Sequence, residues 1–219
     1  MEKNKLVENN CNDEPIYTAA DLICDHEIDA NAIQEAVEKI IRAIGEDPNR
    51  EGLLNKPKRV AKAYEELLEG YRIDPVKLLN NATFDVKYDD MIIIRDIEFY
   101  SLCEHHMLPF LGRAHVAYIP DGKIIGLSKI PRIVDMFSRR LQVQERMTRQ
   151  IADYLNEILH PRGVAVVMEG MHLCAMIRGV RKHDSRMTTS SMLGAFRNRE
   201  ATRMEFLDNI SRGATPLHF

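Results

Sequence analysis

The spacing of apolar residues changes between residues 70 and 82, and this change constrains the fold more than any other feature. Before residue 70 the apolar residues recur every three or four positions, as in amphipathic helices. After residue 82 many of them alternate with polar residues or form short Ile-rich and Val-rich runs, as in strands. Because helices and antiparallel strands occupy separate blocks, we predict an α+β fold with helices on one face of a sheet rather than βαβ winding.

Two helices are predicted in the N-terminal part of the chain. The first covers residues 33–44, with Asn31 and Gln34 as a capping box at its start and Gly45 as its stop. The second begins at Pro57, a residue favoured in the first helical turn, and ends at Gly70. Together they form a helical pair ahead of the sheet.

The rest of the chain is expected to contain a strand meander, a long helical region and further strands. The long helical region runs from Ile130 to Ile158, and Asn198 is expected to cap a last helix that Gly213 ends. The expected strands cover residues 83–88, 91–100, 113–119, a short stretch through Ile125, 163–169 and 173–180.

The charge of the chain is unevenly distributed. The formal net charge is −3, but residues 1–29 carry two lysines and eight acidic residues, so the remainder is basic. We therefore expect a flexible acidic tail over residues 1–28, a helical region over 29–80 and a catalytic domain over 81–219. No apolar run approaches the roughly 20 residues that span a bilayer, and no signal peptide is visible. The expected location is the cytoplasm, where four cysteines would stay reduced.

Two clusters of cysteine and histidine carry the strongest chemical signal. Cys103 and His106 are three residues apart after an Ile-rich strand, and His172 and Cys174 are two apart on an expected strand, hence on one face. Thiolate and imidazole together suit zinc. Two arrangements remain open: all four residues close a structural tetrahedron, or three bind and a fourth position stays open, as catalytic zinc requires.

Basic residues lie near both clusters and suit a polyanionic substrate such as a polyphosphate. They include Lys129 and Arg132 in the long helical region and Arg178 after the second cluster. Gln144 and Glu145, if they point inward, are able to accept hydrogen bonds from the amine and ring N–H of a base such as guanine. The motifs of P-loop kinases, Rossmann dehydrogenases, zincins and zinc deaminases are missing from the sequence, so these classes are disfavoured.

Several long motifs in one order resemble the signature of the GTP cyclohydrolase I family. The resemblance runs from about residue 33 to residue 207. The motifs that carry it are Glu51-Gly52-Leu53-Leu54, Pro57-Lys58-Arg59-Val60, Ser101-Leu102-Cys103-Glu104-His105-His106, Pro109-Phe110, His115-Val116-Ala117-Tyr118-Ile119-Pro120, Gly126-Leu127-Ser128-Lys129-Ile130, Gln142-Val143-Gln144-Glu145-Arg146 and His172-x-Cys174-x-x-x-Arg178-Gly179.

This resemblance implies a tunnelling fold, in which the antiparallel sheets of several subunits join into a barrel. It also implies a homodecamer of two stacked pentamers, with active sites between subunits. The implied reaction is zinc-dependent hydrolysis of GTP at guanine C8 with formate release, followed by ribose rearrangement and ring closure to 7,8-dihydroneopterin triphosphate. That reaction is the first step of pterin and tetrahydrofolate biosynthesis. Neither nucleic acid nor a membrane is an expected partner.

The resemblance also implies a role for individual residues. Cys103, His106 and Cys174 would ligate zinc, with water in the fourth position, and His105 and His172 would be catalytic. The implied substrate-binding residues are Glu145 and Gln144 for the base, Ser128 for the ribose-phosphate portion, Lys129, Arg132 and Arg178 for the triphosphate, and Arg59 from a neighbouring subunit.

Two other functions compete with this one. A structural zinc module with a basic surface for nucleic acid needs a closed site of four ligands. Another tunnelling-fold enzyme, such as a nitrile reductase with a nucleophilic cysteine, has no need of the three proposed zinc ligands.

Overall fold

The structure is a computed structural model that describes residues 27–179, 181–182 and 184–212. Nearly all of the expected tail, with Cys11 and Cys24, and also Gly213, lie outside the described residues. The elements, in chain order, are α1 (Ala30–Ala43), α2 (Lys56–Leu67), the 3-10 helix η2 (Glu69–Arg72), α3 (Pro75–Leu79), β1 (Thr83–Asp85), β2 (Ile92–Cys103), β3 (Pro109–Ile119), β4 (Lys123–Ile125), α4 (Lys129–Ser138), β5 (Leu141–Gln142), α5 (Gln144–Leu159), β6 (Gly163–His172), α6 (Leu173–Met176), β7 (Met187–Gly194), α7 (Ala195–Asn198) and α8 (Glu200–Ser211).

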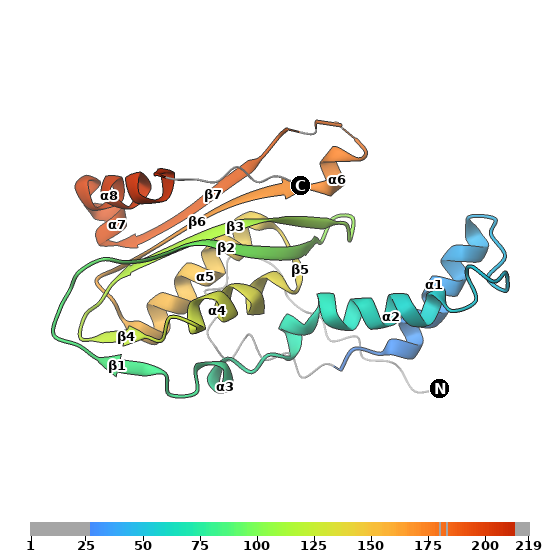
Figure 1. The fold of residues 1–219 in the computed structure, drawn as a ribbon, viewed down its shortest axis with the longest axis horizontal. Coiled ribbons are helices and arrows are strands. Elements are labelled where there is room, and N and C mark those ends of the chain that lie inside the picture. Colours follow the sequence, from blue (N-terminus) through green and yellow to red (C-terminus); the bar gives the residue numbers. More distant parts are fainter. Residues whose placement is uncertain (1–26, 180, 183, 213–219) are drawn as a thin grey trace, which may run out of the picture.

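A five-stranded sheet in the order β5-β2-β3-β6-β7 forms the centre of the fold (Figure 1). The four long strands pair antiparallel with their neighbours, and the register sets Phe110 opposite His172. β5 adds only two parallel pairs at the end of β2, one of them between Cys103 and Gln142. Separately, β1 pairs with β4. Helices and antiparallel strands in separate blocks confirm the predicted α+β class.

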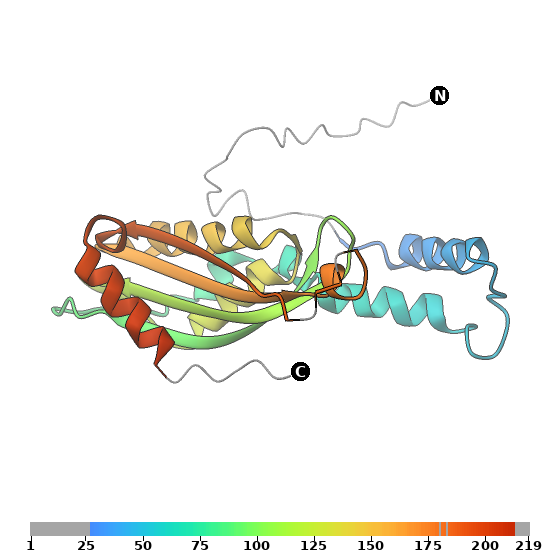
Figure 2. The same ribbon diagram turned by 90° about the horizontal axis from the view of Figure 1, so that it is seen from above.

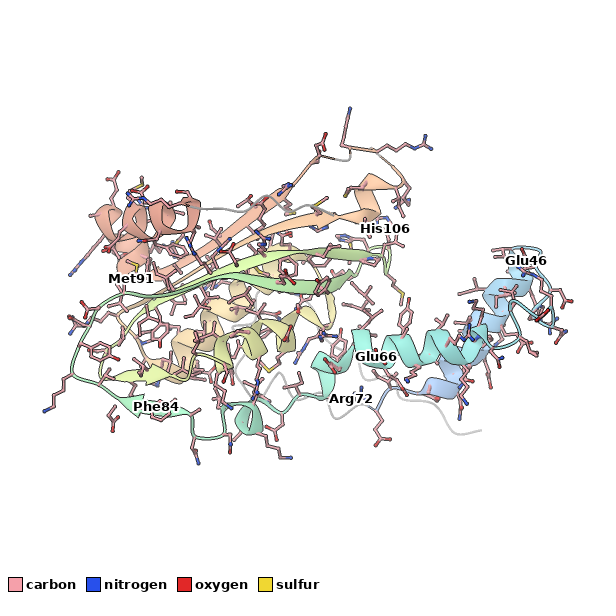
Figure 3. The ribbon with its side chains drawn as sticks, viewed as in Figure 1. Glu46, Glu66, Arg72, Phe84, Met91 and His106 are labelled. Atoms are coloured by element: carbon pink, nitrogen blue, oxygen red, sulfur yellow. The ribbon has the colours of Figure 1, made fainter. Side chains whose placement is uncertain are left out.

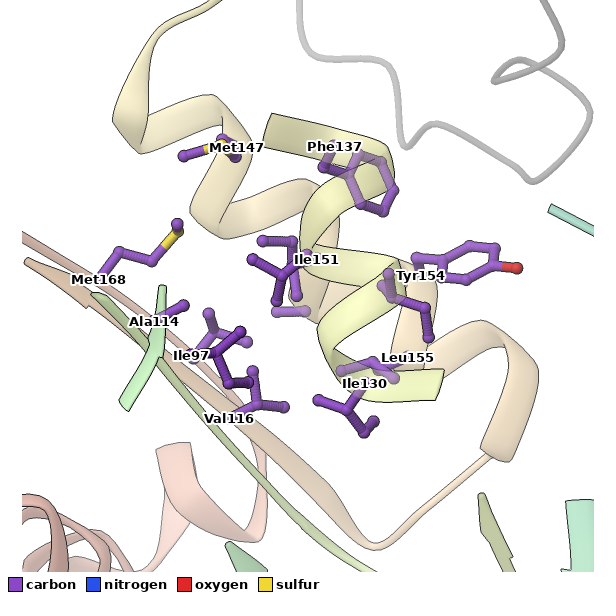
Figure 4. Close-up of a cluster of buried hydrophobic side chains, with 14 of the residues drawn as sticks. Ile97, Ala114, Val116, Ile130, Phe137, Met147, Ile151, Tyr154, Leu155 and Met168 are labelled. Carbon is purple, nitrogen blue, oxygen red and sulfur yellow. The ribbon is translucent and has the colours of Figure 1, made fainter. Parts of the chain in front are cut away.

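The main core lies between one face of the sheet and the helices α4 and α5 (Figures 1 and 2). Figure 4 shows Ile97 and Val116 of the sheet beside Ile151 and Leu155 of α5. Burying each such side chain contributes about 1.5–3 kcal/mol. Burial also raises the pKa of Tyr154 to about 12, so its hydroxyl stays protonated and donates to a backbone carbonyl of α3. This core therefore holds the sheet, both long helices and α3 together.

The opposite face of the sheet is covered at one end by α7 and α8 (Figure 1). Phe196 and Phe206 are fully buried there and pack edge to face, with their ring centroids 5.7 Å apart. The sheet presents small residues beneath them, Ala117 and Ala165. The sheet thus has helices on both faces rather than on one.

The helices α1 and α2 form an arm that extends away from the sheet (Figures 1 and 2). Ile40 and Ile44 on this arm are 59% and 71% exposed. The arm joins the body at Gly70, whose carbonyl accepts from Arg140 Nη2 at 2.7 Å. A Cβ at Gly70 would lie 2.5 Å from the carbonyl oxygen of Met136, so only glycine permits this junction. The helical pair is therefore anchored at one end and exposes apolar side chains at the other.

The predicted N-terminal helices are confirmed, but the cap of the first is not the predicted one. Asp29 is the N-cap of α1, and its carboxylate accepts from the backbone N–H of Ala32 at 2.9 Å. Gly45 follows α1 with φ +87°, as its predicted role as a stop requires. Pro57 lies in the first turn of α2.

The predicted long helical region is wrong as one unit, because β5 divides it into α4 and α5. The buried amide of Gln142 donates to the carbonyl of Phe137 at 2.9 Å and to Gln150 Oε1 at 2.9 Å. The first hydrogen bond gives a backbone carbonyl in the last turn of α4 a partner, and the second links the segment between the helices to α5. The prediction that Asn198 caps the last helix is also wrong, since Asn198 ends α7 and Arg199 precedes α8.

The strand predicted over residues 173–180 is wrong. The chain turns into α6 instead, and the β7 strand comes later. β3 begins at Pro109, and β7 pairs with β6 only as far as Gly170. Beyond His172, therefore, no described strand lies beside β6 to pair with its backbone. The helical turn of α6 instead pairs the backbone N–H and C=O groups of this segment with one another.

Within the described part of the chain, the helices lack the combination of length and apolar character that crossing a membrane requires.

Candidate functional site

Three potential metal ligands converge where β2 and β6 end. The Sγ atoms of Cys103 and Cys174 and a ring nitrogen of His106 all lie within 4.8 Å of one another. Cys103 ends β2, and the following turn is closed by hydrogen bonds from the Cys103 N–H to the Leu108 carbonyl and from the Met107 N–H to the Cys103 carbonyl. The turn presents His106, and α6 returns Cys174 to the same place. Two distant segments thus build one donor group.

The chemistry of this donor group fits a borderline divalent cation such as zinc. Two thiols and one imidazole are typical zinc ligands. Burial raises the pKa of Cys174, and the adjacent Cys103 raises it further, so a thiolate here is disfavoured without a cation. A bound metal reverses this effect and keeps its thiol ligands deprotonated. The pair of sulfurs is therefore suited to a metal ion lying between them.

The neighbouring histidines of the turn have different positions. His105 Nδ1 lies 3.6 Å from Cys103 Sγ, and His105 is exposed. His106 belongs to the donor trio, and the two rings meet edge to face with centroids 6.2 Å apart. His105 thus borders the metal-binding group without belonging to it.

His172 is held by two contacts beside the donor trio. Its Nε2 atom lies 2.9 Å from Gln144 Oε1, and its ring stacks on Phe110 at a centroid distance of 4.6 Å and an interplanar angle of 6°. Burial lowers the pKa of His172, although the Glu145 charge opposes this shift. Among the described residues, the group of donor atoms within 4.8 Å of one another contains Cys103, His106 and Cys174 but not His172, so the geometry favours a trio of ligands over the closed tetrahedron of four.

Gln144, the residue expected to contact a substrate base beside Glu145, lies inside the chain. Its side chain is fully buried. Its Nε2 donates to the carbonyls of Met168 at 3.1 Å and Met187 at 2.9 Å, and to Thr189 Oγ1 at 3.1 Å. With Oε1 facing His172, both ends of the amide are engaged inside the chain. Gln144 therefore contacts His172 from a buried position inside the chain.

Glu145 and Arg178 lie at the same end of the sheet. Both side chains are exposed, Glu145 in the first turn of α5 and Arg178 just after α6. Glu145 acts electrostatically on His172, and Arg178 acts on Cys174. A carboxylate and a guanidinium thus flank the metal-binding group, where they are accessible to a ligand.

Ser128, Lys129 and Arg132 lie together at the start of α4, away from the metal-binding group. Lys129 is buried, and its Nζ donates to the Leu78 carbonyl at 2.7 Å. Arg132 is exposed and lines a cavity of about 530 Å³ beside α3, with Arg72 among its other lining residues. These three expected substrate-binding residues form a second group.

The two groups lie towards opposite ends of the sheet. Ile125, just ahead of Ser128, donates its N–H to Tyr118 Oη at 3.3 Å, near the far end of β3. From Phe110 to Tyr118 the strand extends about 26 Å, at roughly 3.3 Å per residue. Figure 3 shows His106 at one end of the sheet and Phe84 of β1, the partner of β4, towards the other. A single chain therefore does not bring all the expected residues to one ligand.

Arg59 is exposed on α2, within the arm. The arm extends away from the sheet (Figure 1).

Sequence reasoning missed some residues that shape the site. Phe110 was recognised in a motif, but its stacking on His172 depends on strand register. Arg146 Nη2 contacts Glu104 Oε2 at 2.5 Å, and its Nε donates to Gln142 Oε1 at 3.1 Å. This ion pair ties the turn after β2 to α5. In the sequence, the signal for this ion pair was that Glu104 and Arg146 each lie in a motif rich in reactive groups.

Comparisons with known proteins agree with this geometry. A family model described as GTP cyclohydrolase I matches residues 33–211. The protein named GTP cyclohydrolase 1 from Leptospira biflexa is 58% identical over 182 residues, covering 83% of this chain and 100% of its own. The corresponding protein from Chlorobaculum tepidum is 57% identical over 176 residues, covering 80% of this chain and 79% of its own. That from Chlorobium phaeovibrioides is 48% identical over 218 residues, covering 94% and 98%.

The three relatives match over 79% to 100% of their own length, and the segment that the family model matches contains both residue groups and most of the arm. The chain therefore belongs to the GTP cyclohydrolase I family.

Proposed function

We propose that this protein hydrolyses GTP at guanine C8, releases that carbon as formate, and rearranges and closes the remainder to 7,8-dihydroneopterin triphosphate. The observation that carries the proposal is the trio of Cys103, His106 and Cys174 with two further histidines beside it, in a chain of this family. Water is the only other reactant that the overall conversion needs. The cytoplasm suits the reaction because it contains GTP and keeps thiol ligands reduced.

Members of this family depend on zinc, and Cys103, His106 and Cys174 would hold it. Zinc bound there supplies Lewis acidity, which makes water a stronger nucleophile near neutral pH. The remaining contributions come from side chains of the chain itself.

His105 would donate and accept the proton at the imidazole nitrogen of guanine. It lies 3.6 Å from Cys103 Sγ, next to the metal-binding group, and its exposed ring is accessible to a base. Histidine suits both directions of proton transfer near neutral pH. His172 would assist the opening of the five-membered ring from the other side of the trio.

Glu145 would hold the guanine. Its exposed carboxylate accepts hydrogen bonds, and the 2-amino group and N1–H of guanine are two adjacent donors. The position in the first turn of α5 favours a negative charge, because the helix dipole is positive there. Adenine presents no such pair of donors, so this contact selects GTP over ATP.

The triphosphate would lie between copies of the chain. Arg178 belongs to the metal-binding end, whereas Ser128, Lys129 and Arg132 belong to the distant group at the start of α4. A neighbouring copy that brings its α4 start to this metal-binding end would complete the site. Lys129 would then exchange its hydrogen bond with the Leu78 carbonyl for one with phosphate. Arg59 would come from the arm of a third copy.

Open sheet edges support assembly into a ring. β7 forms one edge of the sheet, and β5 covers the other edge, β2, at only Leu102 and Cys103. Such edges favour pairing with another strand, and joining them around a ring produces the barrel of a tunnelling fold. The apolar arm with Ile40 and Ile44 exposed suits contact between two rings. A decamer of two stacked pentamers, the assembly that the family resemblance implies, would use these two interfaces.

A complementation experiment tests the shared site. Cys174→Ala and Lys129→Ala should each be inactive alone, because each removes one half of every site. Co-expressed in equal amounts, they should form mixed oligomers with about a quarter of the wild-type rate of formate release from GTP, since random head-to-tail neighbours restore that fraction of sites.

The control pairs Cys174→Ala with a chain that carries both substitutions. This mixture contains no intact metal-binding end and should stay inactive, while size-exclusion chromatography verifies that the oligomers form. Mixed oligomers of the two single variants that assemble normally yet release no formate would contradict the shared site.

A further inference from the structure

Gln144 occupies an unusual position for an amide side chain. It begins α5, is fully buried, and contacts backbone atoms of two strands as well as His172. Its nitrogen lies 3.1 Å from the Met168 carbonyl oxygen and 2.9 Å from the Met187 carbonyl oxygen. Carbonyl oxygens accept hydrogen bonds and never donate them, so the nitrogen end of the amide must face these two atoms. This requirement fixes the orientation of the amide.

The fixed amide in turn determines which ring nitrogen of His172 carries a hydrogen. Gln144 Oε1 lies 2.9 Å from His172 Nε2, and an amide oxygen only accepts. His172 Nε2 must therefore donate. A neutral imidazole carries one hydrogen, so Nδ1 is left with a free lone pair.

We propose that Gln144 is a positioning residue that holds His172 in its Nε2–H tautomer and so leaves Nδ1 as the ring nitrogen with a free lone pair. The inference rests on the proposed function, in which His172 takes part in ring opening. Gln144 itself touches no reacting atom.

The surroundings of the amide are built to keep it in place. Thr148 Oγ1 donates to the backbone carbonyl of Gln144 at 2.7 Å and lies 2.6 Å from Thr189 Oγ1. The Thr148 hydrogen is thus used, so Thr189 donates to Thr148 and turns a lone pair to Gln144 Nε2 at 3.1 Å, where it shares the two amide hydrogens with the Met168 and Met187 carbonyls. A Cβ on Gly170 would lie 2.4 Å from Gln144 Oε1, so the glycine leaves the space that the amide oxygen occupies.

Phe110 controls the remaining freedom of the ring. Its ring stacks on His172 at 4.6 Å and within 6° of parallel. Stacking sets the plane of the imidazole, and Gln144 sets its rotation within that plane and its tautomer. Together these contacts leave His172 one orientation and one accepting nitrogen.

The most direct test measures the tautomer in the unaltered protein. Solid-state NMR of the full-length, zinc-loaded oligomer with 15N-labelled histidine distinguishes protonated from unprotonated ring nitrogens, and a His172→Asn difference spectrum identifies the signal. At a pH where the ring is neutral, we expect Nε2 protonated and Nδ1 unprotonated. A protonated Nδ1 with an unprotonated Nε2 would overturn the proposal without any effect of mutation on folding.

Gln144→Met adds a kinetic test. This substitution keeps the length of the side chain but removes every hydrogen bond, so His172 should populate both tautomers. We expect kcat for formate release to fall about ten- to a hundredfold, the range found for residues that orient catalytic groups, with KM for GTP within about twofold and zinc content unchanged. An unchanged kcat in a folded variant would contradict the positioning role.

A matched pair of milder variants separates positioning from general packing. Thr189→Val removes one partner of the amide and should lower kcat several-fold with a partly mixed tautomer signal. Thr188→Val changes the neighbouring exposed residue of β7 and should leave both kcat and the spectrum unchanged. Equal effects of the two would reject the proposal. If the unaltered protein releases no formate, the proposed function fails, while the tautomer measurement still decides the structural inference.

Discussion

Replacing Cys174 with alanine is expected to leave the protein with little bound zinc and to lower formate release from GTP by more than about a hundredfold. Loss of a residue that only orients a metal ligand already costs about ten- to a hundredfold, so loss of a ligand should exceed this range. The trio of donors leaves two ligands, Cys103 and His106, after the change. Zinc content is measured by atomic emission and formate by a coupled assay on the same sample.

Cys24→Ala is the matched control for this result. Cys24 lies outside the described residues, and no role is assigned to it, so zinc content and turnover should stay at wild-type values. Cys174→His, which offers zinc a nitrogen donor in place of sulfur, should recover part of the zinc content. A Cys174→Ala protein that holds zinc fully and turns over GTP normally would remove Cys174 from the metal site.

His105→Ala should separate metal binding from catalysis. Because His105 borders the donor trio without belonging to it, the variant should keep its zinc while formate release falls about a hundredfold to ten-thousandfold, the usual contribution of a general acid–base residue. The adjacent substitution His106→Ala removes a ligand and should lose both zinc and activity.

The contrast between these two neighbours is the informative result. They share one turn, so a general disturbance of the turn would affect both properties in both variants. Zinc loss in His105→Ala together with full zinc content in His106→Ala would exchange the roles assigned to the two histidines.

The sequence predicted most of the secondary structure because local signals determined it. Gly45 and Pro57 bracket the loop between α1 and α2 as their backbone preferences require. The Ile-rich run over residues 91–100 likewise predicted most of β2, and the alternation over residues 113–119 predicted most of β3. The strand expected after His172 failed because pairing, which depends on the ends of β3 and β7, decides whether a strand continues. That information lies in segments distant in the sequence.

The candidate site shows the same division between local chemistry and spatial arrangement. Residue type made Cys103, His106, His172 and Cys174 candidate ligands, and the family resemblance reduced them to Cys103, His106 and Cys174. The structure brings the donor atoms of these three together. The burial of Gln144 was unpredictable, since an amide next to Glu145 on a helix looks like surface until the sheet is placed against it. The distance between Lys129 and the trio likewise follows only from the fold.

The most direct test of the central claim follows the carbon that the reaction removes. Zinc-loaded, full-length protein is incubated with GTP labelled with 13C at C8, and 13C NMR and pterin fluorescence are recorded on the same sample. The label should appear in formate, one formate for each pterin, and a chelator should stop both until zinc is restored. Label that stays in a purine, or GTP that remains unchanged with the zinc-loaded protein, would contradict the account.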